Sequence, residues 1–357
     1  MAVTEKAQGR WRRLFAVVLV VVSLGLLVVF AVYLGPYQAF RSSNLNVPEA
    51  GRIYEVSPGT SLNRLAHDLH QEAIIEHPRF FILLGRELAV ATRLQAGQYR
   101  LDPGMTPEAL LKTLARGAVV QQTLTLVEGQ TFRELLTLVH ASDKLRHTLQ
   151  DLDTDELMAA LGHADEHPEG RFLPDTYHFP IGTTDRDFLQ RAYRAMAELL
   201  AKEWVDREAD LPLKSAYEAL ILASIVEKET GLAAERPLIA GVFISRLEQG
   251  MRLQTDPTVI YGMGEDFDGN IRSKDLRADT PYNTYTRYGL PPTPIAMPGA
   301  DAIRAVLHPD KKGYLYFVAR GNGAHYFSRT LEEHNRAVQK FQLRKKHIKL
   351  SEPDQTP

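Results

Sequence analysis

The feature that most constrains this chain is an uninterrupted apolar segment close to its N-terminus. Between Leu14 and Leu34 the sequence reads LFAVVLVVVSLGLLVVFAVYL and contains no charged side chain. A helix needs roughly 20 such residues to cross the hydrocarbon core of a bilayer. We therefore expect residues 14–34 to form one transmembrane helix, with residues 1–13 on one side of the membrane and the rest of the chain on the other.

The charges beside this segment predict its orientation. Four basic residues precede it, Lys6, Arg10, Arg12 and Arg13, whereas only Arg41 follows it closely. Because positive charge stays on the cytoplasmic side, we expect a cytoplasmic N-terminus, a single pass through the inner (cytoplasmic) membrane and a periplasmic or otherwise extracytoplasmic remainder. A cleaved signal peptide is the alternative, but it needs a small-x-small site, which Ala31-Val32-Tyr33 does not supply.

Composition excludes several classes of protein. The 357 residues are 44% hydrophobic, which is enough for two or three modest domains. Lys and Arg number 42 against 44 Asp and Glu, so the net charge of -2 supplies no strong basic field of the kind that nucleic-acid-binding proteins use. The absence of cysteine excludes disulfides, thiolate catalysis and cysteine metal ligands.

Turn residues and apolar spacing divide the remaining chain, and the expected fold class is α+β. We expect a linker at 35–50, a small α+β module at 51–118, a connecting region at 119–210 packed on a catalytic domain at 211–342, and a flexible tail at 343–357. The module should contain a strand at 53–56, a helix capped by Thr60 or Ser61, a helix at 79–88, a strand at 97–101 and a helix from Thr106 to Ala115. Residues 170–177 should form an ordered loop.

The stretch ILASIVEKETG at 221–231 predicts an apolar helix that ends in two carboxylates. A helix from Ser215 to Thr230 should be buried on more than one face, because residues 219–226 are almost all apolar. Glu227 and Glu229 lie about 200° apart on such a helix and cannot serve one site as a pair.

Glu229 continues the bulkier apolar face of this helix. It stacks over Leu222, Ile225 and Val226, so burial should raise the pKa of Glu229 and keep it protonated near neutrality. A general acid needs this protonated state. The alternative is that both glutamates are ordinary charged residues at a helix end.

Three later segments favour a cleft for a polar ligand: residues 250–262, 281–285 and 289–295. They combine Gln, Asn, Asp and Tyr with rigid Pro and Gly, a mixture suited to binding sugar hydroxyls and stacking on sugar rings. The alternative is that Pro and Gly only make tight connections.

These motifs together resemble the membrane-anchored endolytic murein transglycosylases of the YceG-like family. The matching stretches are LVEGQT at 126–131, FLPDTYHF at 172–179, ASIVEKET at 223–230, MRLQTDPTVIYGMG at 251–264, YNTYTRYGLPPTPIAMPG at 282–299 and YLYFVARGNGAHYFS at 314–328. The resemblance implies that Glu229 is the catalytic acid on a lysozyme-like catalytic helix, and that residues 51–118 form a LysM-like module that contacts glycan. Thr293 stands where the family often has Gly after the double proline.

The implied reaction is cleavage of the bond between N-acetylmuramic acid and N-acetylglucosamine in nascent peptidoglycan, without water. It leaves a 1,6-anhydro end, which makes the enzyme a lyase that terminates strand elongation, and it requires no cofactor and no metal. Glu229 would act as general acid and then as general base. The residues expected to hold the sugar are Gln254, Thr255, Tyr261, Asn283 and Tyr285. Peptidoglycan synthases or division proteins are the expected protein partners.

Several alternatives stay open. Asp256 would favour a hydrolase if it faced Glu229, although an Asp before Pro257 is more often a turn or capping residue. His163-Ala164-Asp165-Glu166-His167 fits a zinc-protease pattern, but Gly and Pro flank it and argue against the helix that this pattern requires. His325, beside the predicted hairpin turn Asn322-Gly323, lines the cleft or is structural. The rival from another functional class is a wall-bound scaffold with little catalysis of its own, which recruits synthases through its glycan-binding module and transmembrane helix.

Overall fold

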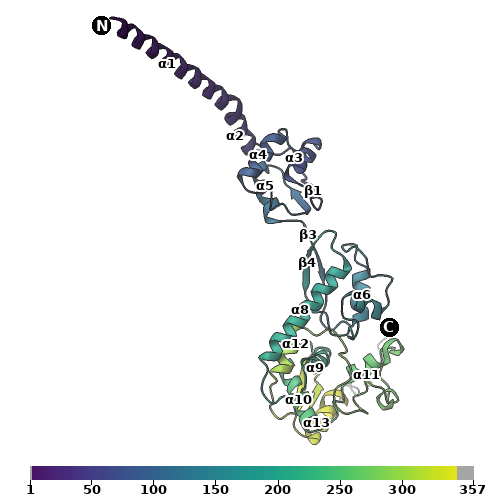
Figure 1. Cartoon of the computed structure of the whole chain (residues 1–357). Helices are drawn as coiled ribbons and strands as arrows, with labels where there is room; N and C mark the ends of the chain where they lie inside the picture. Colours follow the sequence, from purple (N-terminus) through teal and green to yellow (C-terminus); the bar gives the residue numbers. More distant parts are fainter. Residues whose placement is uncertain (1, 344–357) are drawn as a thin grey trace, which may run out of the picture. The chain divides into compact units, whose positions relative to one another are not determined.

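The computed structural model of the chain describes residues 2–343 and divides it into two units, residues 1–122 and 123–357 (Figure 1). Most of the tail predicted at 343–357 lies outside the described residues. In the described part of the chain, helices dominate and the strands form small two-stranded sheets, β1 with β2, β3 with β4 and β5 with β6. This mixed architecture confirms the predicted α+β class.

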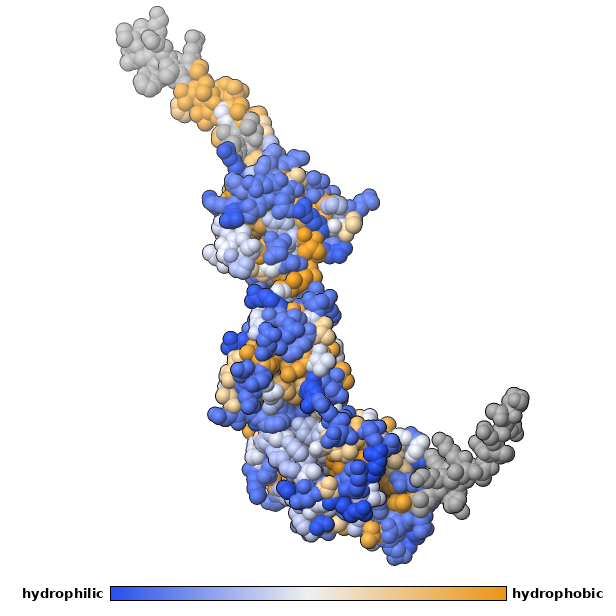
Figure 2. Space-filling model, turned by 90° about the vertical axis from the view of Figure 1, so that its right-hand side faces the viewer, coloured by the Kyte–Doolittle hydropathy of each residue, from blue (hydrophilic) through white to orange (hydrophobic). Residues whose placement is uncertain are grey.

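The first unit begins with α1 (Ala2–Val29), which continues through a π-helical turn, η1 (Phe30–Leu34), into α2 (Gly35–Ser42). Its large apolar side chains between Phe15 and Val28 are exposed and form the orange band of Figure 2. Across residues 2–343, no helix combines the length and the apolar character that a membrane crossing requires. The span predicted at 14–34 stays a prediction.

The module after α2 has the predicted order of elements: β1 (Arg52–Val56), α3 (Leu62–Gln71), α4 (Pro78–Glu87), β2 (Gly97–Leu101) and α5 (Pro107–Arg116). β1 and β2 pair antiparallel, and their buried residues Tyr54 and Tyr99 join a core with apolar residues of the three helices. The side chains of Ser61 and Thr106 cap α3 and α5, as their sequence positions predict.

Residues 35–50 were expected to be a linker, but the structure folds them into this unit. Tyr37, Phe40 and Leu45 are buried in the core of the module. Arg41 pairs with Glu87 at 2.9 Å and with Glu108 at 2.5 Å. The segment was predicted to be a linker because most of its other residues are polar. Burial of these three apolar side chains offsets the conformational entropy that is lost when the segment becomes ordered.

The second unit opens with a subdomain that has a core of its own. The second unit begins within β3 (Gln121–Thr125), which pairs with β4 (Thr176–Pro180). The subdomain also contains three helices, α6 (Phe132–His140), α7 (Thr154–Ala160) and α8 (Asp185–Val205). Phe132 and Phe172 stack in this core, with ring centroids 5.4 Å apart. The prediction of a loop at 170–177 is wrong for its last two residues. They begin strand β4, in which exposed and buried residues alternate from 176 to 180.

The remaining elements surround one buried helix, α9 (Ala216–Glu229), which packs on α10 (Arg236–Glu248) and α12 (Ala300–Leu307) (Figure 1). Every residue of α9 from Ala219 to Val226 is buried, as the apolar run predicts. The shorter elements here are η2 (Ala233–Glu235), α11 (Asp256–Met263), η3 (Gly264–Asp266), η4 (Asp275–Arg277), β5 (Tyr316–Ala319), β6 (His325–Ser328), α13 (Leu331–Val338) and η5 (Gln339–Leu343).

Candidate active site

Glu229 is the last residue of α9, and it reaches the surface of a cleft from inside the core. Ser215 caps the other end of the helix, and the extended backbone of Thr230 ends it directly after Glu229. The hydroxyl of Thr255 donates a hydrogen bond to Oε1 of Glu229. Burial raises the pKa of the Glu229 carboxyl above its usual range, and this outweighs the hydrogen bond from Thr255, which lowers it.

The cleft in front of Glu229 has a volume of about 520 Å³. Its lining comes from the end of α9, from α10, from residues 253–256, from the β5–β6 hairpin and from α13. The polar members of the lining are Glu229, Arg246, Gln254, Thr255, Asp256, Tyr285, Tyr316, His325, His334, Asn335 and Gln342. An open cleft of hydroxyl, amide and aromatic groups around one buried carboxyl suits a hydroxyl-rich ligand.

The structure brings together most of the residues predicted to hold a sugar. Gln254, Thr255 and Tyr285 line the cleft with Glu229, and so does Asp256. Asp256 is the first residue of α11 rather than its cap, and its Oδ1 accepts a hydrogen bond of 2.6 Å from the Tyr285 hydroxyl. The turn or capping role expected for Asp256 is therefore wrong.

Gln254 has a backbone conformation that non-glycine residues rarely adopt, with φ at 50°. Its N–H donates to the carbonyl of Thr284 at 3.2 Å, and the next N–H, of Thr255, donates to the Thr284 hydroxyl at 3.1 Å. These bonds hold the strained turn that presents Thr255 to Glu229. Such strain typically costs about 1–3 kcal/mol and concentrates at functional sites.

Asn283 and Tyr261 do not line the cleft, although both were predicted to hold the sugar. Asn283 is buried, its amide donates to three backbone carbonyls between residues 275 and 278, and its Oδ1 accepts from the N–H of Tyr285 at 2.9 Å. Tyr261 donates to Oε2 of Glu169 at 3.0 Å. Asn283 thus positions Tyr285, and Tyr261 stabilises Glu169, whose pKa burial raises to about 7.

Glu227 faces away from the cleft, as the angle between the two glutamates predicts. Its carboxylate accepts from Nη2 of Arg236 at 3.1 Å and from the N–H of Gly299 at 3.0 Å. Its side chain is only 6% exposed. Both glutamates are therefore largely buried, and the alternative of two ordinary surface charges is wrong. The carboxylate of Glu227 is hydrogen-bonded within the fold, whereas Glu229 lines the cleft.

Sequence reasoning missed several groups of the lining. Arg246 lies in α10, where its guanidinium donates to the carbonyls of Leu315 and Leu253, each at 2.7 Å. Tyr316 and His334 stack on each other, with ring centroids 5.3 Å apart. These residues come from segments far apart in the chain. Only Tyr316 belongs to a stretch identified in the sequence, the motif at 314–328.

The zinc pattern at 163–167 does not form a helix in the structure. His163 stacks on Tyr193 with ring centroids 3.7 Å apart, and Glu166 accepts from the hydroxyl of the same tyrosine at 2.6 Å. Among residues 2–343 there is no group of three His, Cys, Asp or Glu side chains arranged to hold a metal ion. The motif serves packing in the second unit.

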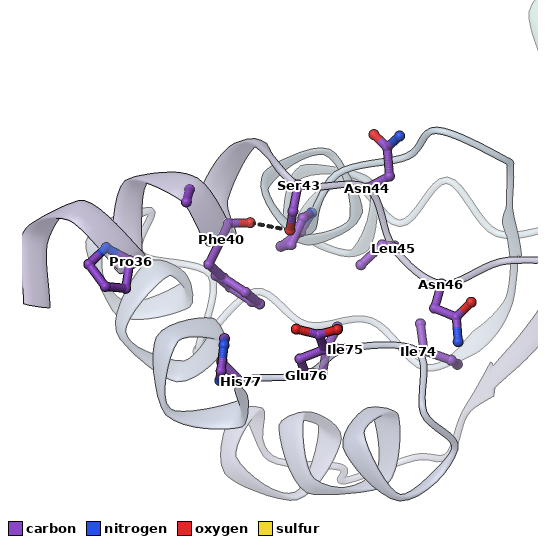
Figure 3. A pocket seen from close by; sticks show the side chains of 12 residues that line it. Pro36, Phe40, Ser43, Asn44, Leu45, Asn46, Ile74, Ile75, Glu76 and His77 are labelled. Carbon is purple, nitrogen blue, oxygen red and sulfur yellow. Dashed lines mark hydrogen bonds between the residues drawn. The ribbon is translucent and has the colours of Figure 1, made fainter. Parts of the chain in front are cut away.

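A cavity of about 340 Å³ in the first unit lies between α2, the segment after it and the turn before α4 (Figure 3). Phe40, Leu45 and Ile75 supply its apolar side, and Ser43 Oγ donates to the Phe40 carbonyl at 2.8 Å. The acid in its lining, Glu76, is exposed, so this cavity lacks a counterpart of Glu229.

The raised pKa of Glu229 predicts a pH-dependent effect on stability. Glu229 binds its proton more tightly in the folded chain than in the unfolded chain, where a glutamate carboxyl has a pKa of about 4.3. The wild type therefore loses the Glu229 contribution to stability as the pH rises from that value through the folded pKa. A Glu229→Gln variant keeps an acceptor for Thr255 and lacks this pH-dependent loss, while groups such as Glu169 titrate alike in both proteins. We expect similar melting temperatures at about pH 4 and a higher one for the variant at about pH 8. A pH-independent difference would contradict the assignment.

The fold and this cleft define an α+β protein with a single carboxylic acid buried at the edge of a carbohydrate-compatible cleft. Comparison with known proteins is consistent with this class. A Bacillus subtilis protein named endolytic murein transglycosylase is 32% identical over 315 residues, 84% of this chain and 84% of that protein. A Streptococcus pneumoniae protein (strain D39) of the same name is 29% identical over 339 residues, 85% of this chain but 61% of that longer protein.

The crystal structure of a YceG-like protein from Listeria monocytogenes superimposes with a TM-score of 0.52 and 32% identity, covering 81% of this chain and 100% of that one. Residues 54–340 match the YceG-like family. The chain belongs to the YceG-like family, as the motifs predict.

Proposed function

We propose that this protein is an endolytic lytic transglycosylase that cleaves the glycan strands of nascent peptidoglycan without water, which would terminate strand elongation. The observation that carries the proposal is the position of Glu229, a carboxyl with a raised pKa at the edge of an open polar cleft. Two relatives named endolytic murein transglycosylase support it.

The reaction uses one carboxyl group in two steps. Protonated Glu229 donates its proton to the glycosidic oxygen, and the bond from that oxygen to C1 of the N-acetylmuramic acid breaks. The Glu229 carboxylate then accepts the proton of the C6 hydroxyl as O6 bonds to C1. The product carries a 1,6-anhydro ring, and Glu229 ends protonated again. Thr255, which donates to Oε1, holds the carboxyl and stabilises its ionised form between the steps.

Gln254 and Tyr285 are the groups that we propose to hold the sugar beside Glu229. Both line the cleft. Thr284 holds the backbone of Gln254, Asn283 holds the backbone of Tyr285, and Asp256 accepts a hydrogen bond from the Tyr285 hydroxyl. The hydrogen bond to Asp256 leaves the Tyr285 side chain less conformational freedom to lose when the sugar binds.

A hydrolase is the second candidate, because Asp256 lines the same cleft as Glu229. Hydrolysis generally uses two carboxyl groups, about 5–5.5 Å apart in retaining enzymes and about 6.5–9.5 Å apart in inverting ones. The hydrogen bond from Tyr285 occupies one oxygen of Asp256, which favours a supporting role. The chemical nature of the product ends separates the two reactions.

The experiment is digestion of peptidoglycan glycan strands by the purified full chain in detergent, followed by mass spectrometry. The full chain is preferable to a fragment that starts at Ser42, because Tyr37 and Phe40 belong to the core of the first unit. We expect products lighter by one water molecule than the corresponding reducing sugars. Reducing ends would identify a hydrolase and implicate Asp256, and no cleavage would favour the scaffold.

We also propose that residues 14–34 anchor the protein in the inner membrane with its N-terminus inside. The charge asymmetry of the sequence and the exposed apolar side chains of α1 support this. Because the chain has no cysteine, single cysteines report topology directly. An impermeant maleimide applied to spheroplasts should label Glu49→Cys but not Thr4→Cys. Labelling of Thr4→Cys in sealed spheroplasts would reject this orientation.

The module at 51–118 is proposed as LysM-like and glycan-binding. Its order of β1, α3, α4 and β2, with the two strands paired, supports the proposal. The Glu229→Gln chain should therefore co-sediment with sacculi more strongly than the same chain without residues 51–118, and equal binding would contradict a glycan contact there. Peptidoglycan synthases or division proteins remain the proposed protein partners.

A further inference from the structure

His325 and Glu235 form a pair beside the cleft that the two-step reaction leaves unused. Nδ1 of His325 lies 2.7 Å from Oε2 of Glu235, and the backbone N–H of His325 donates to Oε1 of the same carboxylate at 2.9 Å. The two side chains are only 12% and 14% exposed. One carboxylate therefore fixes both the backbone and the ring of His325.

The surrounding elements fix the plane of the imidazole. His325 is the first residue of β6 and pairs with Ala319 of β5. The ring makes edge contacts with the rings of Phe317 and Phe327, whose centroids lie 5.4 Å and 6.5 Å away. A histidine that only filled space would not need a carboxylate, a strand and two aromatic rings to hold one orientation.

This orientation leaves one ring nitrogen for the cleft. A carboxylate at Nδ1 favours the tautomer with the proton on Nδ1, which makes Nε2 a hydrogen-bond acceptor. Within residues 2–343 no side chain or backbone group is hydrogen-bonded to Nε2, and His325 lines the cleft together with Glu229. The unused nitrogen of a rigid imidazole thus borders the place where the sugar binds.

We propose that Nε2 of His325 accepts a hydrogen bond from an N–H or O–H group of the sugar that is bound next to Glu229. His325 is then a substrate-contacting residue, and Glu235 is a positioning residue that sets its tautomer. A sugar with a 2-acetamido group and free hydroxyls offers such donors. The inference rests on the proposed function, because it concerns the same cleft and the same reaction.

Two substitutions at His325 separate this role from a structural one. Asparagine places its amide near Nδ1, so His325→Asn keeps the contact with Glu235 and loses the cleft nitrogen. Glutamine reaches the position of Nε2, so His325→Gln supplies an acceptor to the cleft. We expect kcat/KM on glycan strands to fall about tenfold in His325→Asn, the value of one hydrogen bond, and to recover in part in His325→Gln. The reverse order, or no change in His325→Asn, would overturn the proposal.

Glu235→Gln tests the tautomer. One oxygen of the amide replaces two carboxylate oxygens, so either the backbone N–H or Nδ1 of His325 loses its acceptor, and an amide N–H facing Nδ1 moves the ring proton to Nε2. We expect a loss of activity comparable to that of His325→Asn. Full activity of Glu235→Gln would overturn the positioning role. Glu229→Gln measured in parallel keeps the two proposals apart. Cleavage by that variant at the wild-type rate refutes the proposed mechanism, whereas a strongly impaired Glu229→Gln with a fully active His325→Asn refutes only this inference.

Discussion

Glu229→Gln is expected to lower the rate of glycan strand cleavage by about 10²- to 10⁴-fold, the contribution typical of a positioned general acid. Glutamine has nearly the same shape and can still accept the hydrogen bond from Thr255, but it has no proton to give to the glycosidic oxygen. The fold should remain intact, because the variant removes a buried carboxyl whose ionisation is unfavourable. The measurement is the rate of anhydro-end formation by mass spectrometry.

The matched control for this variant lies two residues away in the same helix. Glu227→Gln makes the same chemical change in α9, but Glu227 contacts Arg236 and Gly299 rather than the cleft. Folded Glu227→Gln protein should retain most of the activity at a temperature where it is stable. Equal losses of rate in the two variants would mean that any change in α9 disturbs the cleft, and a fully active Glu229→Gln would remove Glu229 from the mechanism.

The burial of residues 219–226 and the different directions of the two glutamates of α9 could be predicted from the sequence, because both depend only on the spacing of residues within one helix. The run from Ala219 to Val226 predicts burial, and the angle between Glu227 and Glu229 predicts that they serve different surroundings. The same reasoning could not show that Glu227 is also buried, since its partner Arg236 begins another helix. The spacing of residues within a helix does not show which residues of other elements contact it.

The cleft itself could be predicted only in part, for the same physical reason. Gln254, Thr255 and Tyr285 belong to motifs rich in polar and turn residues, and they do line it. Asn283 belongs to the same motif, yet its amide is used by backbone carbonyls near residue 276. Whether a polar side chain faces a ligand or satisfies a buried backbone depends on tertiary contacts, which composition does not specify.

Arg236 is the centre of a largely buried charge network beside α9. Its guanidinium lies 3.1 Å from Glu227, 3.5 Å from Glu128 and 3.8 Å from Asp301. The side chains of Arg236 and Glu227 are 11% and 6% exposed, whereas those of Glu128 and Asp301 are 46% and 63% exposed. Glu227 is therefore the partner that compensates the buried cation, and the other two acids lie at the rim, where solvent weakens their attraction.

Glu227→Gln should consequently destabilise the second unit by about 3 kcal/mol, the lower end of the cost of breaking a buried ion pair, because two rim carboxylates remain. For a unit of this size that corresponds to a fall in melting temperature of about 6–12 °C. Calorimetry of the wild type, Glu227→Gln, Arg236→Met and the double variant measures the coupling. The loss in Glu227→Gln should shrink in the Arg236→Met background, since no buried cation is then left unpaired. Additive losses would show that Glu227 stabilises the fold through Gly299 alone, and a change below about 2 °C would show that the network contributes little to the stability of the second unit.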